Sequence, residues 1–128
     1  MKKISVVPLE SVNDVDFGTE REIVRNSFGK FKEFKKSPLS KNTSDAFEGL
    51  HIFYDCNNRF EAIEFFEVEV FVGNVRFLPS KISDVAKVVL DLVSDESEYW
   101  VSREQSIGIY APNKKIESIL FGIADYYN

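Results

Sequence analysis

Two stretches of the sequence decide the fold: LHIFYDCNNRFEAIEF at residues 50–65 and SIGIYAPNKKIESILF at residues 106–121. They align without a gap and share five identical residues in sixteen, where chance gives about one. Each stretch alternates apolar and polar residues on both sides of a central turn that contains asparagine, which is the pattern of a β-hairpin. The sequence therefore predicts one hairpin that occurs twice.

Each hairpin follows a segment with helical features. A first helix is expected from Thr19, which has capping-box spacing to Glu22, up to Gly29, which suits a left-handed C-terminal position. A second helix is expected from the cap residue Ser80 to about Leu92. Its apolar residues recur at helical spacing: Ile82, Val85, Ala86, Val89 and Leu92.

These elements predict an α+β fold in a single domain, residues 1–128, built of two tandem α-β-β(-β) repeats at about 15–77 and 78–128. One such unit is too small to bury its own apolar face, so two units are expected to share a core. A largely antiparallel sheet with both helices packed on one face follows. Further strands are expected at Glu67–Val72, Val75–Phe77 and Tyr99–Ser102, and residues 37–48 are expected to form a polar connection.

The direction of the side chains gives a first indication of function. An even-numbered turn places Tyr54 opposite Glu61, and the same register places Tyr110 opposite Glu117, so a Tyr–Glu pair is expected in both hairpins. Both faces of both hairpins carry apolar residues, yet two helices cover only one face. The other face must therefore meet a loop, a second subunit or a partner.

Composition excludes several classes of protein. The chain is 44% hydrophobic and 29% charged, with a net charge of −5, which is ordinary for a globular domain and disfavours a nucleic-acid or anionic-membrane binder. One Cys and one His leave no disulfide within the chain, no cysteine-based zinc site and no multi-histidine metal centre. No secretory leader and no membrane-spanning run is recognised. The expectation is a cytoplasmic protein without a cofactor or metal.

One group of residues has the types that nucleophilic catalysis uses: His51, Asp55 and Cys56. Alternation along a strand places His51 and Asp55 on one face and Cys56 on the other, which separates a nucleophile from its base. A histidine half-buried beside Phe53 is the preferred interpretation. No phosphate loop and no nucleophile elbow is present, so the chain is predicted not to be an enzyme.

The negative charge is concentrated in the second part of the chain. Residues 1–48 carry 9 basic and 8 acidic side chains, whereas residues 49–128 carry 7 basic and 13 acidic ones. Solvated strands and loops explain this pattern, and so does an acidic surface for a basic partner. Trp100 fits either an interface or the core. The candidate partner-binding residues are Glu61, Glu64, Glu67, Glu69, Asp95, Glu96, Glu98 and Trp100.

A basic patch lies earlier in the chain, where Phe31 and Phe34 alternate with lysines. Basic and aromatic residues in alternation suit single-stranded nucleic acid, but lysines also protect an edge strand from aggregation. The acidic pI near 4.9 favours the edge strand. The lysines are Lys30, Lys32, Lys35, Lys36 and Lys41.

The stretch DFGTEREIV at residues 16–24, which ends in Phe28-Gly29, resembles the "FGM-x-x-EEV…LG" opening of many small bacterial domains. With LHIFYD at 50–55 and EAIEF at 61–65, the order is similar to the helix-plus-hairpin units of BamE-like and beta-lactamase-inhibitor-protein-like domains. The resemblance implies a protein-binding domain without catalytic residues. Together with the acidic charge and the lack of a recognised secretory leader, this favours a cytoplasmic inhibitor of the immunity type that neutralises a basic toxin. The alternative is a structural or assembly module that self-associates into a homodimer.

Overall fold

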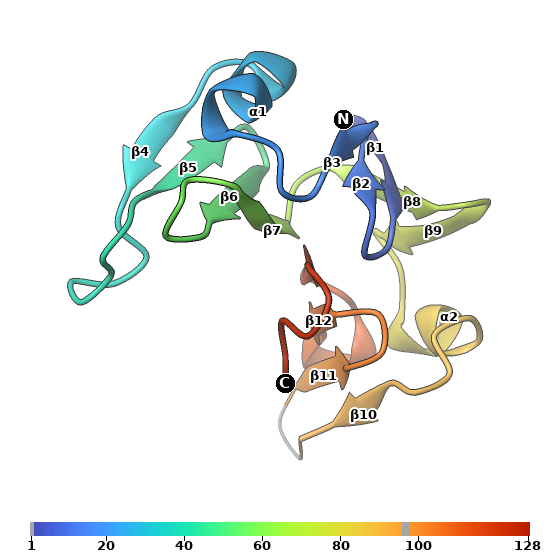
Figure 1. The fold of residues 1–128 in the computed structure, drawn as a ribbon. Coiled ribbons are helices and arrows are strands. Elements are labelled where there is room, and N and C mark those ends of the chain that lie inside the picture. The colour runs from blue at the N-terminus through green and yellow to red at the C-terminus, as the bar shows by residue number, and fades with distance from the viewer. Residues whose placement is uncertain (1, 96–97) are drawn as a thin grey trace.

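The computed structural model describes residues 2–95 and 98–128, and it shows a mostly-β protein with two short helices (Figure 1). The helices are α1 (Arg21–Phe28) and α2 (Ile82–Ala86), and a 3₁₀ turn, η1, covers Pro112–Lys114. A mixed sheet of five strands has the order β3-β2-β1-β8-β9, and an antiparallel sheet of eight strands has the order β10-β11-β12-β13-β7-β6-β5-β4.

The small sheet consists of β1 (Lys3–Val7), β2 (Ser11–Val12), β3 (Val15–Asp16), β8 (Glu69–Val72) and β9 (Val75–Leu78). The large sheet consists of β4 (Lys32–Phe34), β5 (Ser44–Phe47), β6 (Leu50–Tyr54), β7 (Phe60–Phe65), β10 (Val93–Ser94), β11 (Tyr99–Ser102), β12 (Ile107–Tyr110) and β13 (Ser118–Gly122). The expected combination of helices with a largely antiparallel sheet is confirmed. The small second sheet was not expected.

The two hairpins form, and they lie side by side, because β7 pairs with β13 in the middle of the large sheet. The expected unit of one helix and two or three strands does not appear in that form. Each helix is instead followed by four strands of the large sheet, and strands of the small sheet precede it.

The predicted Tyr–Glu pairs are wrong. A bulge between Phe53 and Tyr54 sets Tyr54 opposite Phe60, although Ile52 and Ile63 pair as expected. In the second hairpin the longer turn around η1 moves the register by one residue, so that Tyr110 lies opposite Ser118. Turn geometry fixes hairpin register, and neither irregularity has a clear signal in the sequence.

Both helices differ from the prediction at their ends. The N-cap of α1 is Glu20, without a side-chain cap bond, and Thr19 instead accepts a backbone hydrogen bond from Phe60 (2.9 Å). Gly29 follows α1 with a positive φ of 96°, but its ψ of −139° is not that of the expected left-handed position. The helix α2 ends at Ala86, well before Leu92. Its continuation is rich in β-branched valine, which has a low helix propensity.

Three strands of the large sheet, β4, β5 and β10, lie where the sequence indicated no strand or left a choice between interpretations. β5 falls inside the stretch expected to be a polar connection. β4, in the basic patch, is the edge strand of the large sheet. Of the five lysines only Lys32 lies in this strand, and the others lie before or after it.

The two faces of the large sheet differ in burial. Residues of the covered face are almost all buried, and they pack with the buried residues of α1, α2 and the small sheet in one core. Phe121 lies at its middle, with ring centroids 6.0 Å from Phe65 and 6.3 Å from Phe77 of the small sheet. The covered face is made of Asp45, Phe47, Leu50, Ile52, Ile63, Phe65, Ile107, Ile109, Ile119 and Phe121.

Candidate functional site

The other face of the large sheet, the open face, is the candidate site. One cross-strand row crosses all eight strands on this face: Lys32, Ala46, His51, Glu64, Leu120, Gly108, Val101 and Val93. The six inner members are half-buried and the two end members are exposed. The buried residues of α1, α2 and the small sheet belong to the core on the other face, and the inner side chains of this row keep part of their surface exposed within residues 2–95 and 98–128.

The last residues of the described chain lie across the middle of the open face. Tyr126 and Tyr127 are half-buried there, over strand positions occupied by glycine. A Cβ atom at Gly122 would lie 2.6 Å from Cγ of Tyr126, and one at Gly108 would collide with the Tyr127 hydroxyl group. The glycines therefore let the two tyrosines approach the sheet closely.

We expect Gly108→Val to displace Tyr127 while the sheet stays folded, because valine suits a strand but fills the space of the phenol. Burial raises the pKa of Tyr127 well above the ordinary value, so displacement should lower it. A spectrophotometric titration of the tyrosines at alkaline pH measures this change. Asn128→Ala, next to the ring, is the control, and an unchanged titration of Gly108→Val would contradict the contact.

A small cavity of about 110 Å³ opens beside Tyr127, and Glu64, Tyr99 and Tyr110 also line it. The rings of Tyr99 and Tyr110 lie 4.9 Å apart at their centroids. Glu64 comes from β7, next to Leu120 of β13. The cavity thus lies at the junction of the two hairpins.

Aromatic contacts hold His51 on the open face. Its ring lies 4.7 Å from the ring of Phe34 and 4.9 Å from that of Phe66, centroid to centroid. Burial lowers the pKa of His51, although the charge of Glu64 opposes this effect. His51 is half-buried as expected, but its ring contacts are Phe34 and Phe66 and not the expected Phe53.

His51, Asp55 and Cys56 do not form a nucleophile group. The carboxylate of Asp55 accepts hydrogen bonds from the backbone N–H groups of Asn57 (2.8 Å) and Arg59 (3.0 Å), which shape the turn. Cys56 is exposed in this turn. Among the described residues, no hydrogen bond joins His51 to either of them.

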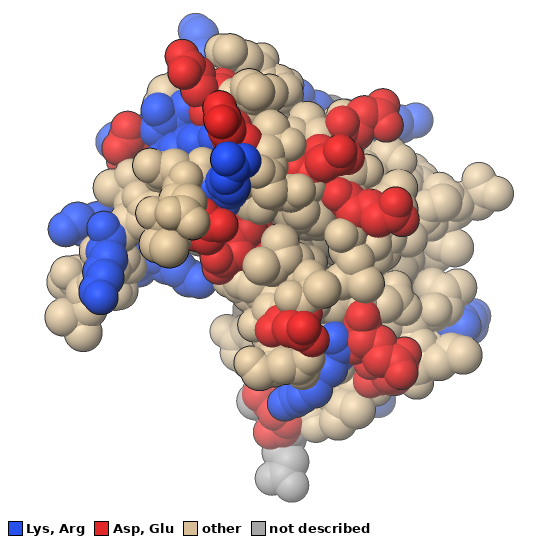
Figure 2. Space-filling view, viewed as in Figure 1, with Lys and Arg blue, Asp and Glu red and all other residues tan. Residues whose placement is uncertain are grey.

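Charge is distributed unevenly around the open face. Basic side chains gather on the loop between β4 and β5, which projects at the left of the molecule (Figure 2). A hollow of about 300 Å³ separates Lys36 and Lys41 of this loop from Glu61 and Tyr126. The Nζ atom of Lys36 lies 4.4 Å from the ring centre of Phe53. The open face is therefore basic at its β4 end and acidic nearer its centre.

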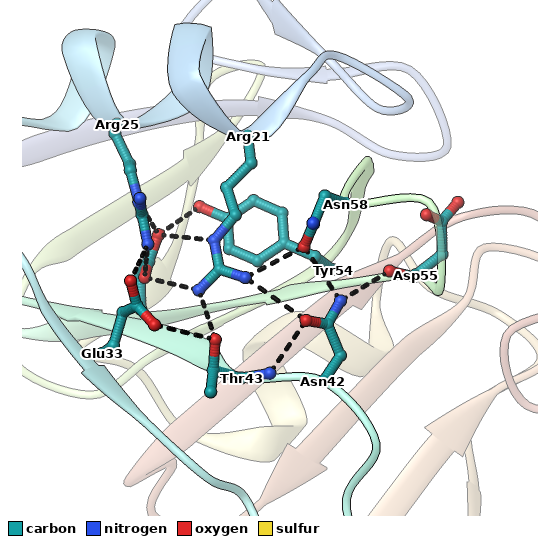
Figure 3. Close-up of polar contacts among 9 residues, drawn as sticks. Arg21, Arg25, Glu33, Asn42, Thr43, Tyr54, Asp55 and Asn58 are labelled. Carbon is teal, nitrogen blue, oxygen red and sulfur yellow. Dashed lines mark hydrogen bonds and ion pairs between the residues drawn. The ribbon is translucent and has the colours of Figure 1, made fainter.

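A buried ion network, which the sequence analysis missed, fastens α1 to the covered face (Figure 3). The carboxylate of Asp45, fully buried, accepts hydrogen bonds from Arg21 (2.8 Å), Arg25 (2.8 and 2.9 Å) and the Tyr54 hydroxyl (2.8 Å). Arg25 also pairs with Glu33 at 2.9 Å. Two arginines and two carboxylates balance in charge, so the network is satisfied internally and acts as a structural clamp. Arginines four residues apart on one helix face were the signal in the sequence.

The clamp predicts a loss of stability in acid. Hydrogen bonds and opposite charges outweigh burial and hold the pKa of Asp45 at about 2 instead of 3.8. Because the pKa of Asp45 is lower in the folded chain than in the unfolded chain, the ionised carboxylate stabilises the fold at any pH above the unfolded pKa. This contribution, about 2 kcal/mol, is lost as the pH falls from 4 toward 2. We expect urea unfolding of the wild type and Asp45→Asn to show a stability difference that narrows over this range. A constant difference would contradict the prediction.

The candidate partner-binding residues are spread over several places. Glu61 and Glu64 lie on the side of the open face. Burial raises the pKa of Tyr126, and the charges of both carboxylates add to this effect. Glu67 is exposed after β7, and Glu69 is in the small sheet, 3.9 Å from Arg76. Asp95 and Glu98 are exposed in the chain between β10 and β11, and Glu96 lies outside the described residues.

Trp100 belongs to the covered side. It is opposite Ile109 in the β11–β12 pair and packs against the core. The position of Trp100 therefore agrees better with a core residue than with an interface anchor.

Within residues 2–95 and 98–128 no helix is long and apolar enough to cross a membrane. The same residues contain no group of three or more His, Cys, Asp or Glu side chains placed to hold a metal ion.

Comparison with known proteins finds no family model, no curated protein and no solved structure that matches this chain. The site is therefore interpreted from its geometry and charge.

Proposed function

We propose that this chain is a non-catalytic, cytoplasmic protein-binding domain whose partner covers the open face of the large sheet. The observation that carries the proposal is the contrast between the two faces: Ile63 and Phe121 of the covered face are 0% exposed, while their neighbours Glu64 and Leu120 remain partly accessible. Aromatic residues with a polar surround have the composition of an interface centre and its rim.

We further propose that the two halves of the chain are related units, with both helices on the covered face. The residues before each helix make equivalent bridges, Glu20 with Arg59 and Lys81 with Lys115. The strand order of the large sheet also has the same connectivity from both ends. A bent sheet made of two such units has one broad face for a partner, which agrees with the resemblance to tandem helix-plus-hairpin domains that bind proteins.

The preferred biological role within this proposal is that of an immunity-type inhibitor of a basic toxin. The net charge of −5 and the carboxylates at the centre of the open face support a basic partner, because complementary charge accelerates association. The association rate should fall as salt is added, since ions screen the attraction.

The test compares two variants with the same added charge. Val101→Arg places a large cation on the open face, and Ile23→Arg places one on α1, where Ile23 is 53% exposed. With a purified candidate partner, such as a basic protein encoded by an adjacent gene, we expect Val101→Arg to weaken binding by at least about tenfold. Equal affinities for the two variants would contradict the proposal.

Self-association is a second candidate function. Leu90 and Val93, at the β10 edge of the large sheet, are 86% and 67% exposed, while lysines protect the β4 edge. An exposed apolar edge strand favours pairing with a second copy. Sedimentation equilibrium should then show a dimer that persists in high salt and is lost in Val93→Lys.

A further inference from the structure

We propose that the central cavity of the open face takes one positively charged side chain, arginine or lysine, from the protein partner. This inference rests on the proposed function and names the chemistry that the partner must present at one place. The inference is based on a carboxylate, three phenol rings and a cavity large enough for the end of one side chain.

The size of the cavity selects its occupant. At about 110 Å³ it is far smaller than the pockets of roughly 300–1,000 Å³ that enclose drug-sized ligands. Leu120 and the backbone of Gly108 contribute to its walls, so the stem of a long side chain finds apolar contacts beside the charged group.

The charge of the cavity is negative. Glu64 is the one ionisable acid or base, apart from tyrosine, among the described residues that line it. Within residues 2–95 and 98–128 Glu64 forms no salt bridge. A guanidinium or ammonium group at this point therefore gains an ionic hydrogen bond without breaking an existing ion pair.

The aromatic residues add a second attraction for a cation. Tyr99, Tyr110 and Tyr127 line the cavity with phenol rings, and the face of an aromatic ring attracts a cation within about 6 Å. Tyr99 and Tyr110 are cross-strand partners in the β11–β12 pair, and Tyr127 lies over Gly108. The rings therefore come from two separate parts of the chain and meet at Glu64.

The shifts in the pKa values of two of these tyrosines agree with a negative environment. The charge of Glu98 is the main cause that raises the pKa of Tyr110, and the charge of Glu117 adds to it. Burial is the main cause for Tyr127, and the charge of Glu64 contributes.

The neighbouring cations do not neutralise Glu64. His51 is its cross-strand partner, and burial lowers the pKa of this histidine, which favours the neutral ring at pH 7. Lys36 lies over the ring of Phe53, on the same strand as His51. The carboxylate thus remains available to a cation from outside the chain.

The test uses N-acetyl-arginine amide as a probe, with N-acetyl-citrulline amide as a neutral control of nearly the same shape. We expect the amide NMR signals of Gly108, Ser118 and Leu120 to shift in a saturable way with the arginine probe, in the millimolar range. The citrulline probe should not saturate these signals. Equal effects of both probes, or saturable shifts confined to other parts of the chain, would overturn the inference.

Two variants assign the interaction to the cavity. Glu64→Gln keeps the shape of the side chain and should lower the affinity for the arginine probe at least about fivefold. Tyr99→Leu should lower this affinity about twofold to fivefold. Glu10→Gln, which removes an equal charge from an exposed turn of the small sheet, should leave binding unchanged. An undiminished affinity in Glu64→Gln would overturn the inference.

The two proposals fail in different ways. If the arginine probe does not bind but Val101→Arg still weakens the partner, the cavity inference is wrong and the open face remains the interface. If Val101→Arg and Ile23→Arg bind the partner equally, the proposed function itself is wrong.

Discussion

Replacing Asp45 by alanine is expected to lower the free energy of unfolding by about 3–5 kcal/mol. The carboxylate is fully buried and accepts hydrogen bonds from Arg21, Arg25 and Tyr54. Its loss leaves two arginines without their shared partner, and unpaired charges in a protein interior are costly. Equilibrium unfolding in urea measures the effect.

A matched control compares the loss of this buried carboxylate with the loss of an exposed carboxylate of equal charge. Glu33 also pairs with Arg25, but its side chain is 52% exposed, and exposed ion pairs contribute about 0–1 kcal/mol. Glu33→Ala should therefore be nearly as stable as the wild type. Similar losses for the two variants would mean that the clamp does not hold α1 on the sheet.

Phe121→Ala is expected to have an effect of similar size, about 3–5 kcal/mol, because it opens a cavity in a close-packed core. The ring is 0% exposed and contacts Phe65 of the first hairpin and Phe77 of the small sheet. The variant tests whether the two halves and the small sheet share one core. Far-UV and near-UV circular dichroism during unfolding should lose their signals together.

Phe34→Ala provides the comparison on the open face. Phe34 is only half-buried, on the edge strand β4, so its removal should cost clearly less than that of Phe121. If Phe34→Ala were the more damaging change, the core would have to lie on the other side of the large sheet.

The sequence predicted the hairpins because their signal is local. Alternation and asparagine turns identify β6, β7, β12 and β13, and a strand can be recognised from such a pattern alone. The pairing of Leu50 with Phe65 followed from the turn, as the structure shows.

The sequence could not predict features that depend on contacts between distant segments. β5 carries Asp45, which looks like a loop residue until Arg21 and Arg25 of α1 reach it. The small sheet joins β1 to β8 in parallel, across more than 60 residues. Neither contact leaves a periodic pattern in the chain.

The candidate site was predicted in part. The reasoning that one sheet face lacks a helical cover indicated the open face, and Glu61 and Glu64 lie on that side. The acidic residues beyond β7 were grouped by proximity in sequence, but the structure distributes them over other elements. The tyrosine cavity was missed because Tyr127 reaches Gly108 only after the chain has folded back over the sheet.

Side-chain footprinting of the complex with a purified partner tests the central claim most directly. Hydroxyl radicals label exposed side chains, and mass spectrometry compares the free and bound chain residue by residue. We expect Tyr99, Tyr110 and Leu120 of the open face to become protected, whereas Ile23 on α1 and Leu9 next to the small sheet stay as reactive as in the free chain. Protection of Ile23 and Leu9 with unchanged labelling of the open face would contradict it.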